Sequence, residues 1–191
     1  MKKKRLVKKE VTKNIYVHND ISNAAFHLKE RIEKNHAAGN NEGISLDIMS
    51  CLIMYAFEFE AKVNFVGHMK ILNWKERDSF HKKVKKINNV LGIKVDKNSR
   101  PYTTIEYLKS YRDSIAHGKP FNSQNTETSK MLSEEINSAI DLDNGLYDLC
   151  TISFMRECEA DIENIWKNWL NVASIDIDKT ITHGSFSAEI L

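Results

Sequence analysis

The stretch SLDIMSCLIMYAFEFEAKVNFVGHMK, residues 45–70, holds the longest mostly apolar run of the chain. Placed on a helical wheel, its apolar residues leave little polar surface, which is typical of a helix packed on several sides. Two glutamates, a lysine and an asparagine interrupt the run, so it is too polar to span a membrane. The stretch therefore predicts a central core helix and neither a membrane segment nor a membrane partner.

Segments with helical spacing of apolar residues lie on both sides of this stretch. They cover residues 21–38, 74–91, 103–115, 131–140 and 146–173. Asn19–Asp20 is a candidate cap for the first, and Thr103-x-x-Glu106 is a capping-box pattern at the start of the third. The predicted fold is all-α, an antiparallel bundle of five to six helices.

The predicted bundle spans residues 19–173. A basic N-terminal arm, residues 1–18, precedes it, and an extension, residues 174–191, follows it. We expect both to be short and irregular, although alternating apolar residues leave open a short strand in each. Only two prolines and seven glycines in 191 residues argue against a turn-rich β-sandwich.

Cysteine content and the N-terminal residues indicate the compartment. Three cysteines cannot form a paired disulfide framework, and the start MKKKRLVKKE runs into polar residues without the apolar stretch of a signal peptide. We therefore expect a cytoplasmic protein. Cys150 and Cys158 lack a His-plus-acid arrangement in the sequence, so we expect them to be buried, unreactive thiols. No pattern of metal-ligating or phosphate-loop residues occurs, so no metal and no cofactor are expected.

Charges are separated along the chain despite a net charge of only +2. Residues 2–9 carry six positive charges, and residues 70–97 carry nine basic against three acidic residues. Residues 127–163 carry ten acidic and two basic residues. This separation is compatible with a basic surface that faces a polyanion, or with a solvated face and a loose charged tail.

Arg112 lies within the apolar stripe of the segment that begins near residue 103, where an unpaired guanidinium would be costly. Glu60 is in phase with the inward-facing residues of the central helix, so we expect it to pair with Arg112. Glu58 instead has Lys62 four residues on, and we expect these two to form an exposed ion pair. The Glu60–Arg112 pair is open to two interpretations, a structural ion pair or a guanidinium oriented to bind phosphate.

The string YRDSIAHGKP, residues 111–120, contains an arginine, four intervening residues and a histidine. With the preceding FEFEAKVNF helix, it resembles the HEPN superfamily (higher eukaryotes and prokaryotes nucleotide-binding domains). The resemblance implies an all-α bundle that forms homodimers. In many members it also implies a metal-independent endoribonuclease tied to toxin-antitoxin or phage-defence systems, with an antitoxin as partner. Other members are inactive modules that bind a nucleotide, RNA or a protein.

Carried over onto this chain, the resemblance implies that Arg112 binds the scissile phosphate, that His117 transfers protons and that Asp113 supports the arginine. RNA can be cut by its own 2′-hydroxyl, so the reaction needs a group that titrates near neutrality and a fixed cation. Glu60, Tyr111 and Ser114 are candidate supporting residues. The candidate RNA-binding residues are lysines of the basic segment and one beside the motif, Lys82, Lys83, Lys85, Lys86 and Lys119.

Five helical steps turn His117 about 140° away from Arg112, so the two do not share one face of a regular helix. Either the helix unwinds near Gly118 and Pro120, or a two-fold dimer brings two motifs into one cleft. His117 could also serve only as a last-turn partner of the helix dipole. The chain is therefore predicted to be an RNA-cleaving homodimer, with the inactive binding module as the alternative.

Overall fold

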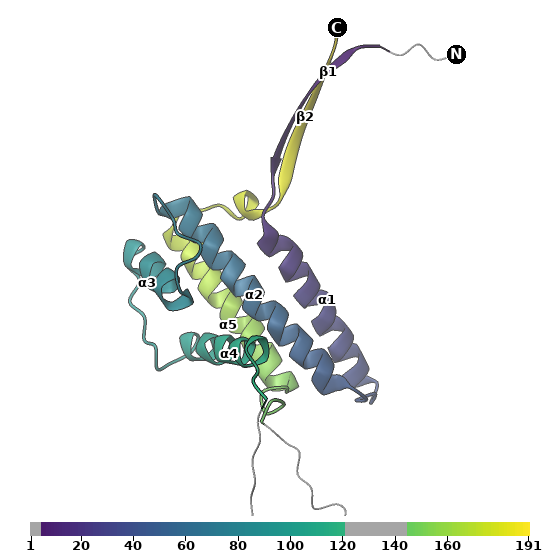
Figure 1. Cartoon of the computed structure of the whole chain (residues 1–191), viewed down its shortest axis with the longest axis vertical. Coiled ribbons are helices and arrows are strands. Elements are labelled where there is room, and N and C mark those ends of the chain that lie inside the picture. Colours follow the sequence, from purple (N-terminus) through teal and green to yellow (C-terminus); the bar gives the residue numbers. More distant parts are fainter. Residues whose placement is uncertain (1–4, 121–144) are drawn as a thin grey trace, which may run out of the picture.

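The computed structural model describes residues 5–120 and 145–191, and the described part is mainly helical, as predicted. α2, Ile44–Lys70, contacts every other α-helix of the described part. α1 spans Val17–Ala37 and α5 spans Ile152–Val172, and both run beside α2 (Figure 1). α3, Phe80–Val90, flanks α2, and α4, Tyr102–Ala116, crosses the lower part of the bundle. The helix expected at residues 131–140 lies outside the described residues.

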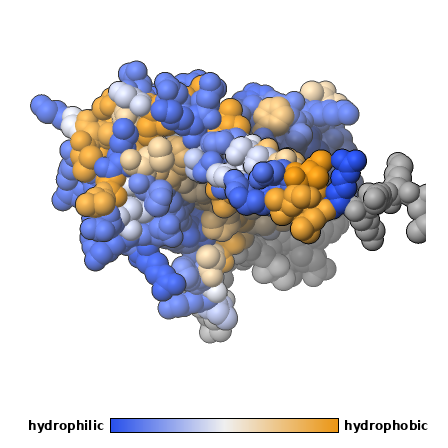
Figure 2. Space-filling model, turned by 90° about the horizontal axis from the view of Figure 1, so that it is seen from above, coloured by the Kyte–Doolittle hydropathy of each residue, from blue (hydrophilic) through white to orange (hydrophobic). Residues whose placement is uncertain are grey.

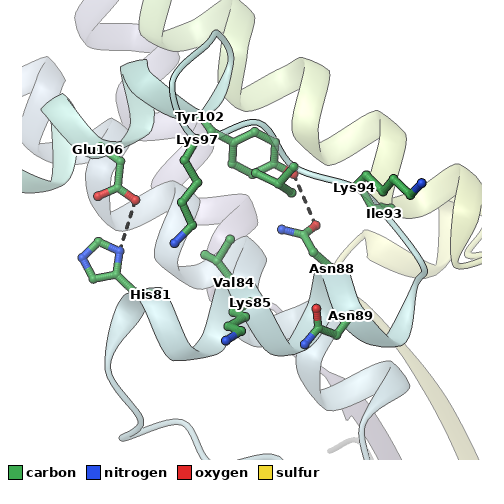
Figure 3. A pocket seen from close by; sticks show the side chains of 11 residues that line it. His81, Val84, Lys85, Asn88, Asn89, Ile93, Lys94, Lys97, Tyr102 and Glu106 are labelled. Carbon is green, nitrogen blue, oxygen red and sulfur yellow. Dashed lines mark hydrogen bonds and ion pairs between the residues drawn. The ribbon is translucent and has the colours of Figure 1, made fainter.

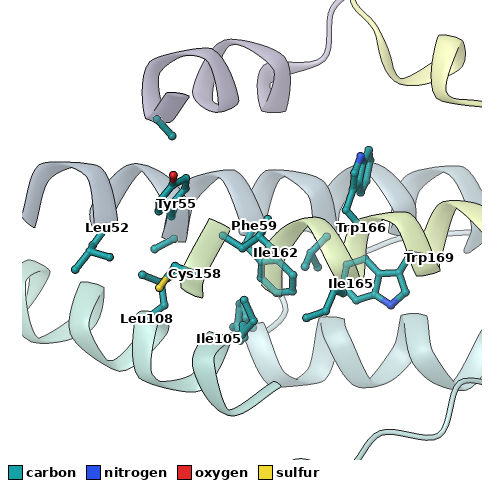
Figure 4. Packing of buried hydrophobic residues seen from close by; sticks show 14 of the residues in the cluster. Leu52, Tyr55, Phe59, Ile105, Leu108, Cys158, Ile162, Ile165, Trp166 and Trp169 are labelled. Atoms are coloured by element: carbon teal, nitrogen blue, oxygen red, sulfur yellow. The ribbon is translucent and has the colours of Figure 1, made fainter. Parts of the chain in front are cut away.

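The core lies where α2, α4 and α5 meet, and it is rich in aromatic and branched side chains (Figure 4). Phe59 of α2 lies against Trp169 of α5, with ring centres 5.6 Å apart. Trp166 and Trp169 are both buried, so the tryptophans of α5 are core residues and not stacking surfaces for bases. The central position predicted for residues 45–70 is thus confirmed.

α3 is shorter than the predicted segment 74–91, because the first residues of that segment pack against α2 and precede the helix. Trp74 packs on Gly67, where a β-carbon would come within 2.4 Å of the indole ring. Only glycine allows this close approach. The helix then starts after Ser79, and Asp78 accepts bonds from Lys82 and Lys86 of the first two turns.

Two predicted caps are wrong. α1 begins at Val17, so Asn19 lies inside its first turn and instead binds the C-terminal segment through Thr180 and Thr182. α4 begins after Pro101 without a side-chain cap. The predicted cap Thr103 lies inside the first turn, and its partner in the pattern, Glu106, lies 3.1 Å from His81 of α3. At Asn19 and at Glu106, a tertiary contact takes the side chain that a local cap would have used.

The terminal extensions are ordered as a strand pair, which corrects the expected irregular ends. β1, Val7–Asn14, pairs with β2, His183–Ile190, in an antiparallel register that sets Val7 opposite Ile190 and Asn14 opposite His183. The pair projects from one end of the bundle (Figure 1). Sequence patterns find hairpins between neighbouring strands, but these two strands come from opposite ends of the chain.

One face of the strand pair is more apolar than the other. Val11 and Phe186 are cross-strand partners on it, and both are exposed. The view from above shows further exposed hydrophobic residues at the outer end of the pair (Figure 2), where Leu6, Ile190 and Leu191 are more than half exposed. A two-stranded sheet without a covering layer is only marginally stable by itself.

Glu58 and Lys62 form a buried ion pair, whereas the sequence predicted an exposed one. Lys62 Nζ lies 2.6 Å from Glu58 Oε1, and their side chains are only 7% and 9% exposed. Ser22 of α1 donates to the same carboxylate at 2.8 Å, and Lys62 lies over the ring of Trp166. The apolar stripe of α1 does not show that a polar residue beside it, Ser22, also contacts α2.

No helix in residues 5–120 or 145–191 is both long and apolar enough to cross a membrane.

Candidate functional site

Arg112 sits on the side of α4 that faces α2, at the edge of the core. Its Nη2 lies 3.4 Å from Glu60 Oε2, so the pairing predicted from the two apolar stripes is confirmed. The guanidinium also lies over the ring of Phe57, 5.9 Å from the ring centre. The side chains of Arg112 and Glu60 are 23% and 30% exposed, so this pair is more accessible to solvent than Glu58–Lys62.

Arg112 belongs to a row of alternating charges that runs across three helices. Glu60 also binds Lys83 of α3 at 2.8 Å, and Arg112 Nε lies 3.1 Å from Asp113 Oδ1. Asp113 in turn binds Lys109 at 2.6 Å. The order Lys83, Glu60, Arg112, Asp113, Lys109 gives three cations for two carboxylates, which leaves the row with a net positive charge.

Lys83 is the end of this row that is closed to solvent. Its side chain is 1% exposed and donates to both Glu60 and Asn64. It cannot reach a phosphate at the surface, so its assignment to an RNA-binding face is wrong. Helical spacing placed Lys83 among solvated lysines, but α3 is rotated so that this one points at the acidic side chain of α2.

Asp113 is held in its charged form by its neighbours. The hydrogen bond from Lys109 comes first, and the charge of Arg112 adds to it, so the pKa of the Asp113 carboxyl lies below its usual range. Asp113 Oδ1 lies 3.1 Å from Arg112 Nε, so its charge attracts the guanidinium, although Nε has no hydrogen-bond partner within the described residues. This is the position that the resemblance gives it.

His117 is exposed at the C-terminal end of α4. Its backbone N–H donates to Asp113 O at 2.9 Å, so the helical hydrogen-bond pattern continues to this residue instead of unwinding before it. Within the described residues, its side chain has no hydrogen bond or ion pair. Arg112 and His117 therefore lie on different sides of α4 in one chain, as five helical steps dictate.

Tyr111 and Ser114 do not contact Arg112 through their side chains. Tyr111 is buried, and its hydroxyl lies 2.9 Å from Cys150 Sγ. Ser114 donates to the backbone oxygen of Tyr111 at 2.7 Å. Burial raises the pKa of the Cys150 thiol and raises that of Cys51 to about 12, as expected of buried, free thiols.

The remaining candidate lysines are accessible but differ in their partners. Lys82 and Lys86 both bind Asp78, which lowers the pKa of that carboxyl to about 2. Lys85 and Lys119 are exposed and have no ion pair in the described residues. The basic segment therefore offers fewer free charges than its composition indicates.

No group of three or more metal-ligating side chains occurs within residues 5–120 and 145–191. Comparison with known proteins found no matching family model, no similar curated protein and no similar solved structure.

Proposed function

We propose that this chain is a metal-independent endoribonuclease of HEPN type that acts as a homodimer. The observation that carries the proposal is the setting of Arg112. A guanidinium at the edge of the core is paired with Glu60 and Asp113 yet remains partly open to solvent, and an exposed histidine follows five residues later. A fixed cation and a nearby titratable group are the two parts that RNA cleavage without a metal needs.

In the proposed reaction, a phosphate oxygen of the RNA takes the open side of the Arg112 guanidinium. The Glu60 contact there is long, at 3.4 Å, so a shorter charge-assisted bond to phosphate competes with it. The ribose 2′-oxygen attacks phosphorus and the bond to the 5′-oxygen breaks. His117 accepts the 2′-hydroxyl proton or, when protonated, supplies the proton that the 5′-oxygen takes up. The products are a 2′,3′-cyclic phosphate and a free 5′-hydroxyl.

The dimer part of the proposal follows from the shape of α4. Arg112 and His117 lie on different sides of the helix, so one chain cannot direct both at one phosphate unless the RNA bends around it. In a two-fold dimer, Arg112 of one chain and His117 of the other can face the same cleft. Phe57, beside Arg112, and Tyr107 of α4 are exposed and offer apolar surface for such an interface.

RNA would approach this cleft over the accessible lysines, Lys82, Lys85, Lys86 and Lys119. Neutralising phosphates with lysine makes the affinity fall with added salt. A role as a toxin or phage-defence component in the cytoplasm, with an antitoxin partner, belongs to the same proposal through the resemblance alone.

The direct test is cleavage of varied RNAs by the purified protein in EDTA. We expect cleavage that leaves cyclic phosphate ends and is lost in Arg112→Ala and in His117→Ala, both of which should remain folded by circular dichroism. Lys34→Ala on α1 is a matched control that removes one exposed charge elsewhere. Cleavage that survives both motif substitutions would separate the motif from the activity.

An inactive binding module is the second candidate, and one observation favours it. Arg112 and His117 lie on different sides of α4, and Glu60 and Asp113 already pair with Arg112, so one chain does not bring both groups to one phosphate. Under this reading, wild type cleaves no RNA under any condition, while RNA or a nucleotide binds with an affinity that Arg112→Ala weakens.

A further inference from the structure

A pocket of about 540 Å³ lies between α3, the N-terminal part of α4 and the segment 93–97 that joins them. Its volume falls in the range of small-molecule sites. Figure 3 shows side chains from all three parts around it. None of its lining residues belongs to the charge row around Arg112.

Asn88 gives this pocket a fixed hydrogen-bond donor. The residue is only 4% exposed, and its Oδ1 accepts from Trp169 Nε1 at 2.8 Å and from the Tyr102 hydroxyl at 3.3 Å. Because an indole nitrogen can only donate, Oδ1 must be the atom on that side. The amide nitrogen therefore points the other way, toward Val84 and Lys97 (Figure 3). It has no partner in the described residues.

The charges around the pocket favour an anion. Lys85, Lys94 and Lys97 line it, and none of them forms an ion pair within residues 5–120 and 145–191. Glu106 is the one lining carboxylate and lies 3.1 Å from His81, so the lining has three lysines against one carboxylate. The ammonium group of Lys97 points toward α3, whereas that of Lys94 extends outward (Figure 3).

Apolar side chains complete the lining. Val84, Ile93, Val95 and the ring of Tyr102 form surface on which a flat or apolar group can rest. The amide nitrogen of Asn88 has no protein partner within the described residues, so a ligand or water in the pocket can accept its hydrogen bond. The lining lysines, with Lys97 on the side toward which that donor points, favour an anion, and the apolar residues favour an attached less polar part.

We propose that this pocket binds a small phosphorylated molecule, with the phosphate held by Lys85 and Lys97 and the Asn88 amide donating to the ligand. The inference is independent of the proposed ribonuclease activity, since no residue of the motif takes part. Lys85 is shared with the RNA-binding surface proposed above, whereas Lys97 and Asn88 are not.

The test measures binding by isothermal titration calorimetry with AMP, ribose 5-phosphate, inorganic phosphate and uncharged adenosine. We expect AMP to bind about tenfold or more tightly than adenosine, because hydrogen bonds to charged groups contribute at least that factor. Ribose 5-phosphate and inorganic phosphate distinguish the sources of the affinity. Equal binding of all three phosphates would assign it to the phosphate alone, still within the proposal.

Variants locate the site. Asn88→Asp keeps the acceptor that Trp169 and Tyr102 need but replaces the donor with a negative oxygen, so it should abolish AMP binding. Lys97→Gln should weaken AMP binding about tenfold without touching the core, which keeps the test decisive if Asn88→Asp does not fold. Lys34→Gln, an exposed lysine of α1 on the other side of the bundle (Figure 1), should bind as wild type.

Two results would overturn the proposal. One is the absence of binding by any of the three phosphates at millimolar concentration. The other is AMP binding that Lys97→Gln leaves unchanged or that Arg112→Ala removes, because the ligand would then occupy the motif and not this pocket. Persistence of AMP binding in Arg112→Ala, with no RNA cleavage, would support the pocket even if the ribonuclease proposal failed.

Discussion

Glu58 and Glu60 are two residues apart on α2, yet they serve different surroundings. Glu58 faces α1 and α5, where Lys62, Ser22 and the ring of Trp166 enclose the ion pair. Glu60 faces α3 and α4, with one oxygen on buried Lys83 and the other on half-open Arg112. The first carboxylate is mostly buried and lies beside a pocket between α1, α2 and α5, whereas the second joins the core to the surface.

The difference shows where function can reside on this helix. Exchanging a partner for a ligand costs more at a short, buried ion pair than at a long contact to a partly exposed guanidinium. We therefore assign stability to Glu58–Lys62 and ligand contact to Arg112. The predictions below separate these two roles.

The largest stability effect is expected at Lys62. Lys62→Met should lower the free energy of unfolding by about 3–5 kcal/mol, because it leaves the enclosed Glu58 without a cation. Urea unfolding measures this. The double variant Glu58→Leu/Lys62→Met should recover most of the loss, and a double variant as unstable as the single one would show that the charge is not the cause.

Glu60→Ala should cost about 2–4 kcal/mol, mainly through Lys83, which would keep only Asn64 as a partner while buried. Adding Lys83→Met should restore stability, whereas adding Arg112→Ala should not, because Arg112 can turn to solvent. The same urea experiment on the three variants checks this order. If Arg112→Ala restored the stability of Glu60→Ala and Lys83→Met did not, Arg112 and not Lys83 would be the cation that depends on Glu60.

His18 should make the protein less stable in acid. Burial among Tyr16, Phe65 and Trp166, together with the charge of Lys62, lowers its pKa to about 4 from 6.5. Between pH 6.5 and 4 the unfolded chain binds a proton that the folded chain does not. Stability should therefore fall by up to about 3 kcal/mol as the pH decreases through this window, and His18 should contribute no slope above it.

Thermal unfolding from pH 4 to 8 measures this dependence, with two variants. His18→Phe should remove most of the acid slope, whereas His27→Gln, an exposed histidine of the same helix, should retain it. An unchanged slope in His18→Phe would assign the acid sensitivity to other groups.

The smallest stability effect is expected at Arg112 itself. Arg112→Ala should change the free energy of unfolding by about 1 kcal/mol or less, because a partly exposed ion pair contributes little. Differential scanning calorimetry would detect a larger loss. A cost comparable to that of Lys62→Met would make the Glu60–Arg112 pair a structural one and weaken its functional assignment.

The sequence predicted the helices and the Glu60–Arg112 pair because periodicity reports which residues share a face. It predicted Glu58 and Lys83 to be exposed, because the helical wheel of a single helix does not show which neighbouring helix buries its polar residues. The strand pair was missed because its partners are more than 160 residues apart. The pocket had no signal in sequence, since Asn88 becomes a directed donor only through Trp169 and Tyr102.

The central claim is that Arg112 of one chain and His117 of another form one cleavage site. Mixing Arg112→Ala with His117→Ala protein after subunit exchange tests it directly, since each is expected to be inactive alone. Random pairing gives half mixed dimers with one intact site each, so about a quarter of wild-type RNA cleavage should return. Wild-type cleavage without any recovery in mixtures whose exchange is verified by mass spectrometry would contradict the shared site.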